Sequence, residues 1–223
     1  MWIMSDERSI YAALLSGGKD SNYAILVNRR LTGRMPCCAI TVRAKEDDML
    51  FHYENVRWAE LQCRSMGIPW IFVDDLGYGL KEARERYGAE VLLTGGILSN
   101  FQKKRFESIA DEFGMKVHSP LWGVDQEDYM IRLAEEGIEY IIVKVAALGL
   151  GREWLGRKIG MSETRKLIEL SRRYRFNPSF EGGEAETFVL RSPLYSRGII
   201  IKQYDIIWKK DSGVYLIKEA ALE

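Results

Sequence analysis

Short apolar runs alternate with helix-like patterns along roughly the first 145 residues of the chain. Compact apolar runs are typical of buried strands, whereas apolar positions three and four residues apart are typical of helices that cover a sheet. Strands are predicted at residues 10–15, 37–42, 70–73, 91–94, 115–118 and 140–145. Helices are predicted between them at residues 21–30, 55–66, 80–87, 101–113 and 126–136. This alternation predicts an α/β fold, with a doubly wound and mostly parallel sheet covered by helices on both faces.

The pattern changes after about residue 145. Three glycines punctuate residues 149–156, and a helix is predicted at residues 162–174. Strands are then predicted at residues 186–190, 199–208 and 214–218, with a hairpin turn at residues 210–213. We therefore predict two domains, which are residues 1–147 and a small C-terminal α+β subdomain of residues 148–223.

The charged residues balance, because the chain has 32 Lys and Arg and 32 Asp and Glu. A chain without net charge has no overall electrostatic attraction to nucleic acid or to anionic lipid. Basic clusters at residues 103–105 and 172–175 are interpreted as solvated helix faces, since acidic neighbours interrupt them. Charges at Asp6, Glu7 and Arg8 break up the N-terminal stretch, which predicts no signal peptide and a cytoplasmic location. We therefore expect no stable nucleic-acid partner and no membrane partner.

Three cysteines and two histidines are a poor supply of ligands for metal or disulfide chemistry. Cys37 and Cys38 are adjacent in an apolar run, so as strand residues they would point to opposite faces of a sheet. Free cysteine packs like a small apolar side chain. We interpret both as core thiols and expect no structural zinc.

A Ser-Gly-Gly-Lys-Asp-Ser loop lies between the first predicted strand and the first predicted helix. Glycines let backbone N–H groups approach a phosphate, and a helix N-terminus has unpaired N–H donors that favour an anion. The spacing matches neither a Walker A loop nor G-x-G-x-x-G, and the alternative is an ordinary turn capped by serine or aspartate. With its hydroxyls and positive charge, the loop predicts a site for a pyrophosphate-sized anion formed by Ser16, Gly17, Gly18, Lys19, Asp20 and Ser21.

Thr94, Gly95 and Gly96 end the fourth predicted strand. In doubly wound sheets, ligands bind at the carboxyl ends of the strands, where loops and helix N-termini converge. We assign this turn to the nucleotide or the adenylate, with a plain turn between strand and helix as the alternative.

These motifs together carry a family resemblance. The loop of residues 16–21 resembles the PP-loop of the ATP pyrophosphatases, which split ATP into AMP and pyrophosphate while activating a substrate as its adenylate. The order of the later motifs is similar to that of the diphthine-ammonia ligase family over nearly the whole chain. They are Phe51-His52 with Asn55, residues 94–99, Gln102 with Arg105 and Glu107, and residues 120–123, 142–145, 154–157 and 181–188.

The resemblance implies a HUP-type fold, like that of the adenine nucleotide alpha hydrolases, with a PP-loop nucleotide-binding domain and a C-terminal substrate-binding subdomain. It implies an ATP-dependent carboxylate–ammonia ligase that amidates diphthine on translation elongation factor 2, with ATP, Mg²⁺ and ammonium as the small reactants. ATP would adenylate the carboxylate, and ammonia would displace AMP. Lys19 would neutralise phosphate, and Asp20 would either contact the metal or accept hydrogen bonds at the helix start.

Three carboxylates surround a Gly-Gly pair just before a strand, at residues 181–187. Such a cluster would hold ammonium, and like-charge crowding would raise a carboxylate pKa and help it act as a base. The alternative is a turn with solvated glutamates. The catalytic residues implied are Lys19, Asp20, Glu184 and Glu186. The substrate-binding residues implied are Ser99, Gln102, Arg105, Glu107, Arg157, Glu181, Gly182, Gly183, Glu184 and Thr187.

The sequence departs from the family at Ala185, where an aromatic residue is common, and near Ser179, where a cysteine is often found. His52 is interpreted either as a satisfied polar residue or as a substrate contact. The alternative functions are a PP-loop enzyme acting on another carboxylate or on tRNA, and a module that binds ATP without turnover. Neutral charge and core cysteines disfavour the tRNA reading. The oligomeric state is not set by the sequence, and a homodimer stays open.

Overall fold

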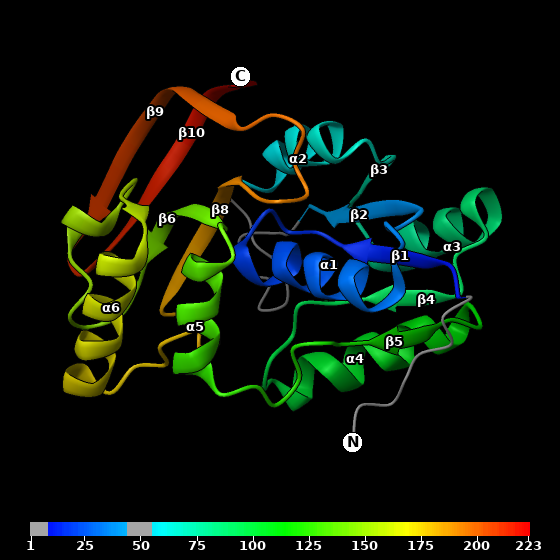
Figure 1. Ribbon diagram of the computed structural model, residues 1–223, viewed down its shortest axis with the longest axis horizontal. Coiled ribbons are helices and arrows are strands. Elements are labelled where there is room, and N and C mark those ends of the chain that lie inside the picture. The colour runs from blue at the N-terminus through cyan, green and yellow to red at the C-terminus, as the bar shows by residue number, and fades with distance from the viewer. Residues whose placement is uncertain (1–8, 44–54) are drawn as a thin grey trace. The chain divides into compact units, whose positions relative to one another are not determined.

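The computed structural model describes residues 9–43 and 55–223, so the predictions on Phe51 and His52 lie outside the described residues. Contacts divide the chain into two compact units. The first comprises Met1–Ser16 and Asp20–Trp122, and the second comprises Gly17–Lys19 and Gly123–Glu223. Figure 1 labels the helices and strands of the chain.

The first unit contains a five-stranded parallel sheet with the strand order β3-β2-β1-β4-β5, which confirms the predicted α/β fold. Its strands are β1 (Tyr11–Leu14), β2 (Cys38–Val42), β3 (Trp70–Val73), β4 (Val91–Leu93) and β5 (Lys116–His118). Its helices are α1 (Lys19–Thr32), the 3-10 turn η1 (Val56–Trp58), α2 (Ala59–Met66), α3 (Leu76–Tyr87) and α4 (Asn100–Glu112). The first residue of α1, Lys19, is grouped with the second unit.

The strand order fixes where the helices of this unit lie. Connections run outward from β1 to β3 and then cross back to β4 and β5. Because such crossovers are right-handed, α1 and α2 belong on one face of the sheet and α3 and α4 on the other. The packing agrees, since Leu80 of α3 and Phe106 of α4 share one buried cluster with Ile40 of β2. Gly79 lets α3 approach β2, because a Cβ there would lie 2.6 Å from the Ile40 side chain.

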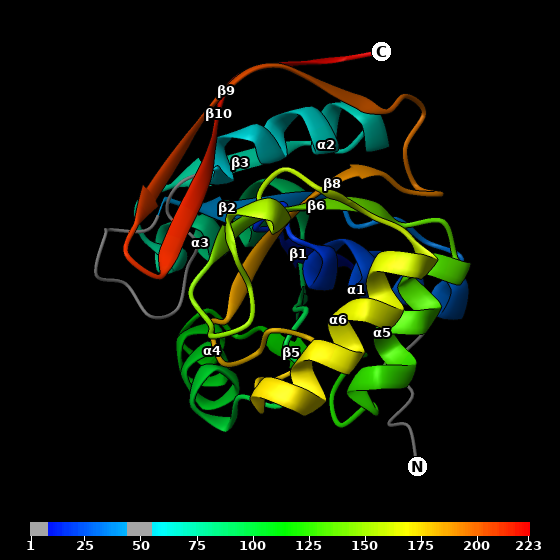
Figure 2. The same ribbon diagram turned by 90° about the vertical axis from the view of Figure 1, so that its left-hand side faces the viewer.

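The second unit contains an antiparallel sheet with the order β7-β6-β10-β9, in which β8 also pairs with β6. Figure 2 shows β9 and β10 as a long hairpin. The strands are β6 (Glu139–Val145), β7 (Lys158–Ile159), β8 (Ala185–Arg191), β9 (Ile199–Lys209) and β10 (Ser212–Leu222). The helical elements are α5 (Gln126–Glu135), the 3-10 turn η2 (Arg152–Trp154) and α6 (Met161–Tyr174).

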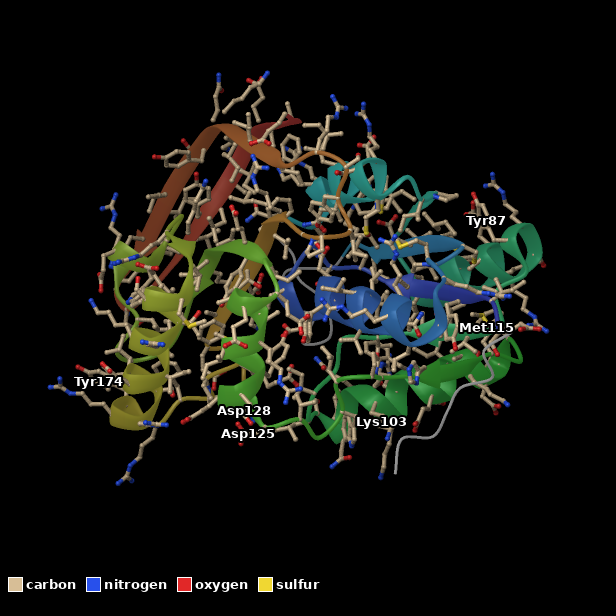
Figure 3. All side chains as sticks on the ribbon, viewed as in Figure 1. Tyr87, Lys103, Met115, Asp125, Asp128 and Tyr174 are labelled. Atoms are coloured by element: carbon tan, nitrogen blue, oxygen red, sulfur yellow. The ribbon has the colours of Figure 1, made fainter. Side chains whose placement is uncertain are left out.

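Helix α5 opens with a clear capping signal. Asp125 precedes the helix, and its carboxylate accepts a hydrogen bond from the Asp128 N–H at 3.0 Å (Figure 3). This contact satisfies one of the N–H groups that the first turn of a helix leaves unpaired. Helix α5 lies beside α6, and the two are joined by a charged hydrogen bond from Arg172 to Glu127.

The predicted domain boundary at 147/148 lies inside the second unit, after β6 rather than before it. The physical reason is that β6 does not extend the parallel sheet, but pairs antiparallel with β7, β8 and β10. Because β6 is mostly buried, its apolar pattern would be the same in a parallel or an antiparallel sheet, so the sequence pattern did not separate the two. Among the described residues, no helix combines the length and the apolarity needed to cross a bilayer.

The side chains of Cys37 and Cys38 do not point in the directions that the sequence predicted. Cys37 precedes β2 instead of lying in it, and its Sγ lies 3.8 Å from the Sγ of Cys38. They therefore do not point to opposite faces, as two consecutive strand residues would. Cys38 is fully buried and Cys37 is half-buried, and both are free thiols.

Candidate active site

The phosphate loop, residues 16–21, follows β1 at the point where the strand order reverses. Strand β1 is flanked by β2 and β4, whose connections leave in opposite directions. Such a switch point is where open α/β sheets bind their ligands. Within the first unit, the hydroxyl oxygens of Ser16 and Ser21 lie 3.4 Å apart. Asp20 stands in the first turn of α1, where the helix dipole favours a negative charge.

The Thr94-Gly95-Gly96 turn lies directly against the start of α1. A Cβ on Gly95 would lie 2.6 Å from the backbone carbon of Asp20 and 2.6 Å from the backbone nitrogen of Ser21. Only glycine permits this approach of one backbone to another. The Thr94 hydroxyl lies 2.7 Å from the Ser119 hydroxyl, at the end of the neighbouring strand β5. The first unit therefore gathers hydroxyls and helix-terminal backbone at one edge of the sheet.

His118 is a neighbour of this turn that the sequence reasoning did not select. It ends β5, and its carbonyl oxygen accepts the Thr94 N–H at 2.9 Å. Its Nε2 atom is buried and has no hydrogen-bond partner among the described residues. Burial lowers the pKa of His118, because desolvation penalises the charged imidazolium. Burial therefore favours the neutral imidazole over the imidazolium.

The predicted substrate-binding residues on and before α4 are of two kinds, those that form the helix cap and those that are exposed to solvent. The Ser99 hydroxyl accepts the Gln102 N–H at 3.3 Å and so caps the helix. Arg105 and Glu107 are exposed on the same helix. Lys103, labelled in Figure 3, has its ammonium 4.4 Å from the centroid of the Trp122 ring. Lys103 therefore contacts an aromatic ring. This differs from the prediction that residues 103–105 form a solvated helix face.

The middle of the phosphate loop is bonded to strand β8 in the second unit. The Gly17 carbonyl accepts the Val189 N–H at 3.0 Å, and Gly17 adopts a φ of 88° that favours glycine. The Lys19 N–H donates to the Thr187 hydroxyl at 3.1 Å. The Lys19 ammonium donates to the Ser179 carbonyl at 2.6 Å. This is where the structure brings predicted ATP-binding and acceptor-binding residues together.

The acceptor loop, residues 177–184, is organised by Glu184. The Glu184 carboxylate accepts the N–H of Asn177 at 2.9 Å and the N–H of Gly182 at 2.8 Å. A Cβ on Gly182 would lie 2.7 Å from that carboxylate, so the first glycine of the pair allows the contact. Gly183 turns the chain with a φ of 83°. Glu184 therefore stabilises its own loop by binding two of the loop's N–H groups. Glu181 is half-buried in the same turn.

Glu186 has a different partner from Glu184. Its carboxylate receives a hydrogen bond from the Lys144 ammonium at 3.0 Å, across the pairing of β8 with β6. The two glutamates thus have separate donors, and the predicted crowding of carboxylate charges stays a prediction. The predicted catalytic roles of both stay predictions.

Arg157 directly precedes β7, in the segment that leads to α6. Its guanidinium donates to the Glu163 carboxylate at 3.0 Å and lies 5.1 Å from the centroid of the Trp154 ring. Hydrogen bonds from Ser162 and Arg157 lower the pKa of Glu163 to about 2. The structure thus gives Arg157 a partner within its own unit, and its predicted contact with substrate stays a prediction.

The residues of the phosphate loop fit a magnesium ion held mainly by nucleotide. Mg²⁺ usually takes one or two protein carboxylates and fills its shell with phosphate oxygens and water. Asp20 supplies one partly exposed carboxylate in the first turn of α1. In the described part of the chain, no cluster of three or more His, Cys, Asp or Glu side chains could hold a metal without other ligands. The predicted role of Asp20, as a metal contact or as an acceptor at the helix start, stays a prediction.

Comparison with known proteins gives matches over both parts of the chain. The family described as diphthamide synthase N-terminal domain matches residues 9–117, and the diphthamide synthase C-terminal domain matches residues 125–222. A Bos taurus protein named diphthine–ammonia ligase is 30% identical over 226 aligned positions, covering 88% of this chain and 84% of that protein. The Homo sapiens protein of that name is likewise 30% identical, with the same coverage. A Schizosaccharomyces pombe protein of that name is 35% identical over 132 residues, covering 59% of this chain and 22% of that protein.

Proposed function

Because the chain belongs to the diphthamide synthase family, we propose that it amidates the diphthine side chain of translation elongation factor 2 at the expense of ATP. The family predicted from the motifs is thereby confirmed. The geometric observation that supports the proposal is the phosphate loop at the switch point of the sheet, where Gly95 allows close approach to the start of α1. The C-terminal match, residues 125–222, contains the acceptor loop.

The first chemical step is adenylation of the acceptor. An oxygen of the diphthine carboxylate attacks the α-phosphorus of ATP, the bond from that phosphorus to the bridging oxygen breaks, and pyrophosphate leaves. Backbone N–H groups of the phosphate loop and the hydroxyls of Ser16 and Ser21 hold the phosphates, because donors fixed before the reaction stabilise developing charge. The turn at Thr94 and Gly95, which packs against the start of α1, would lie beside the nucleotide. Asp20 would hold Mg²⁺ together with ATP, and the ion would neutralise phosphate charge.

The second step forms the amide. Ammonium loses a proton, the nitrogen lone pair attacks the carbonyl carbon of the acyl-adenylate, and AMP leaves with the oxygen that joined it to the carbonyl. A further proton leaves the nitrogen as the amide forms. We assign attraction of ammonium and acceptance of a proton to the carboxylates at Glu181, Glu184 and Glu186.

The test uses the purified chain with ATP, Mg²⁺, ammonium and elongation factor 2 that carries diphthine. Pyrophosphate release and the mass of elongation factor 2 are measured together, because amidation replaces a hydroxyl by an amino group. Both should change in parallel for the wild-type chain. Asp20→Asn should reduce both by roughly 100-fold or more. Asp111→Asn, which alters an exposed aspartate of α4, is the matched control. Pyrophosphate release without any change in the mass of elongation factor 2 would reject this acceptor.

A further inference from the structure

The side chain of Lys19 is buried, and its contacts are with other residues of the second unit, to which Lys19 belongs. Only 1% of this residue is exposed, although lysine carries a charge that is costly to remove from water. Its ammonium donates to the Ser179 carbonyl at 2.6 Å. It also lies 5.3 Å from the centroid of the Phe180 ring and 5.8 Å from that of Tyr129. A carbonyl oxygen and two aromatic faces are the kind of surroundings that stabilise a desolvated cation.

Ser179 makes hydrogen bonds through its N–H, its hydroxyl and its carbonyl oxygen. Its N–H and its hydroxyl both donate to the Asn177 side-chain oxygen, at 3.0 and 2.9 Å. The hydroxyl also lies 2.7 Å from the side-chain oxygen of Gln126 on α5. The Lys19 ammonium binds the remaining group of this residue, the carbonyl oxygen. Lys19 is therefore part of the network that fixes Ser179.

The next residue, Phe180, has a backbone conformation that needs such support. Its φ is 68°, in the left-handed region that residues other than glycine rarely occupy. A strained residue of this kind persists where its surroundings hold it in place, and such residues gather at functional sites. The peptide bond between Ser179 and Phe180 carries the carbonyl that Lys19 binds. Lys19 thus holds the acceptor loop at its most strained point.

The backbone of Lys19 faces a separate partner. Its N–H donates to the Thr187 hydroxyl, two residues before the N–H of Val189 that binds the Gly17 carbonyl. Backbone and side chain of one loop residue are therefore bonded to β8 and to the acceptor loop. We infer that Lys19 is a positioning residue for the acceptor loop, and that its ammonium does not serve as a phosphate ligand. This inference rests on the proposed function for the identity of the two substrates.

Lys19→Met tests the inference because methionine keeps an unbranched apolar stem and removes the ammonium. We expect the dissociation constant of a non-hydrolysable ATP analogue to change by less than about threefold. We expect kcat/KM for diphthine-bearing elongation factor 2 to fall by about tenfold or more. Lys166→Met, which alters an exposed lysine of the same unit, should change neither quantity. A loss of nucleotide affinity as large as the loss of acceptor kcat/KM, or larger, would overturn the inference.

A milder variant and a structural measurement cover the case in which methionine prevents folding. Lys19→Gln retains an N–H donor at the end of a shorter stem, so it should restore part of the acceptor kcat/KM that methionine loses. Amide hydrogen exchange at residues 179–184 should be faster in either variant than in the wild type, and unchanged exchange would overturn the inference. If the wild-type chain fails to amidate elongation factor 2, the proposed function fails. Analogue affinity and amide exchange then still decide the role of Lys19.

Discussion

Replacing Gly95 by alanine should disturb the start of α1 directly. The added Cβ would lie 2.6 Å from the backbone carbon of Asp20 and the backbone nitrogen of Ser21, and 2.8 Å from the Asp20 carbonyl oxygen. These are backbone atoms, so no change of side-chain rotamer relieves the contact. Ordinary contact begins at 3.4 Å, and the two backbones must therefore separate by about 0.8 Å. Overpacking of this kind costs about 1–3 kcal/mol.

The same displacement should weaken nucleotide binding, because the moved atoms belong to the phosphate loop. For a chain of 223 residues, a loss of about 1–3 kcal/mol lowers the unfolding temperature by roughly 2–12 °C. Misplacing reacting groups by about 1 Å costs roughly 100-fold in rate. Thermal unfolding and pyrophosphate release measure the two effects.

Gly96→Ala is the matched control for stability. A Cβ there meets no atom closer than the Thr94 hydroxyl oxygen at 4.0 Å. Its unfolding temperature should therefore stay within about 2 °C of the wild type, in line with a cost below about 0.5 kcal/mol. The steric reasoning is refuted if Gly95→Ala unfolds at the wild-type temperature and retains the wild-type rate.

Three further predictions concern charged groups. Burial holds the pKa of His118 below its ordinary value of 6.5, so the unfolded chain binds a proton at a higher pH than the folded chain does. The free energy of unfolding should therefore fall as the pH drops below about 6.5, and urea denaturation at several pH values measures this. His118→Gln should flatten that fall, and an unchanged slope would contradict the assignment. Hydrogen bonds from Ser162 and Arg157 lower the pKa of Glu163 to about 2, from an ordinary value of 4.5. The ionised carboxylate therefore stabilises the fold at pH values above about 4.5, and this contribution is lost as the pH falls toward 2. Glu163→Gln should remove this part of the acid dependence in the same titration. Lys144→Met should cost about 1–3 kcal/mol in urea denaturation, because it leaves Glu186, whose side chain is 16% exposed, without its ammonium. Adding Glu186→Gln should recover part of the loss, and strict additivity of the two changes would argue against the pairing.

The sequence pattern predicted the first unit well because its signals are local. A short apolar run marks a strand such as β3, Trp70–Val73, whereas α3 begins at Leu76 after the capping Asp75, earlier than the predicted start at residue 80. Right-handed crossovers then restrict how parallel strands can be ordered. Strand β6 shows where local signals end. It is buried along most of its length, and a covered central strand reads the same in a parallel or an antiparallel sheet.

In the candidate site too, some features are visible in the local sequence and others depend on the fold. The order of glycines and hydroxyls in the phosphate loop is a local property, so it is visible in the sequence. The hydrogen bond between Lys144 and Glu186 joins residues 42 positions apart, and it requires the register of β6 against β8. His118 was missed for a related reason. Nothing beside it in the sequence indicates that its Nε2 atom is buried without a partner among the described residues.

Lys19 shows how a correct motif can leave a side chain's task undecided. The motif places a positive charge next to glycines suited to phosphate, and proximity in sequence favours a phosphate contact. A lysine ammonium, however, stands at the end of a flexible four-carbon stem, so its position is independent of the peptide that carries it. Here the stem leads to the Ser179 carbonyl and two aromatic rings, in a site where burial of the charge is compensated. The direction of that stem depends on residues 110 to 161 positions later in the chain. The assignment therefore needs the fold and the variant measurements together.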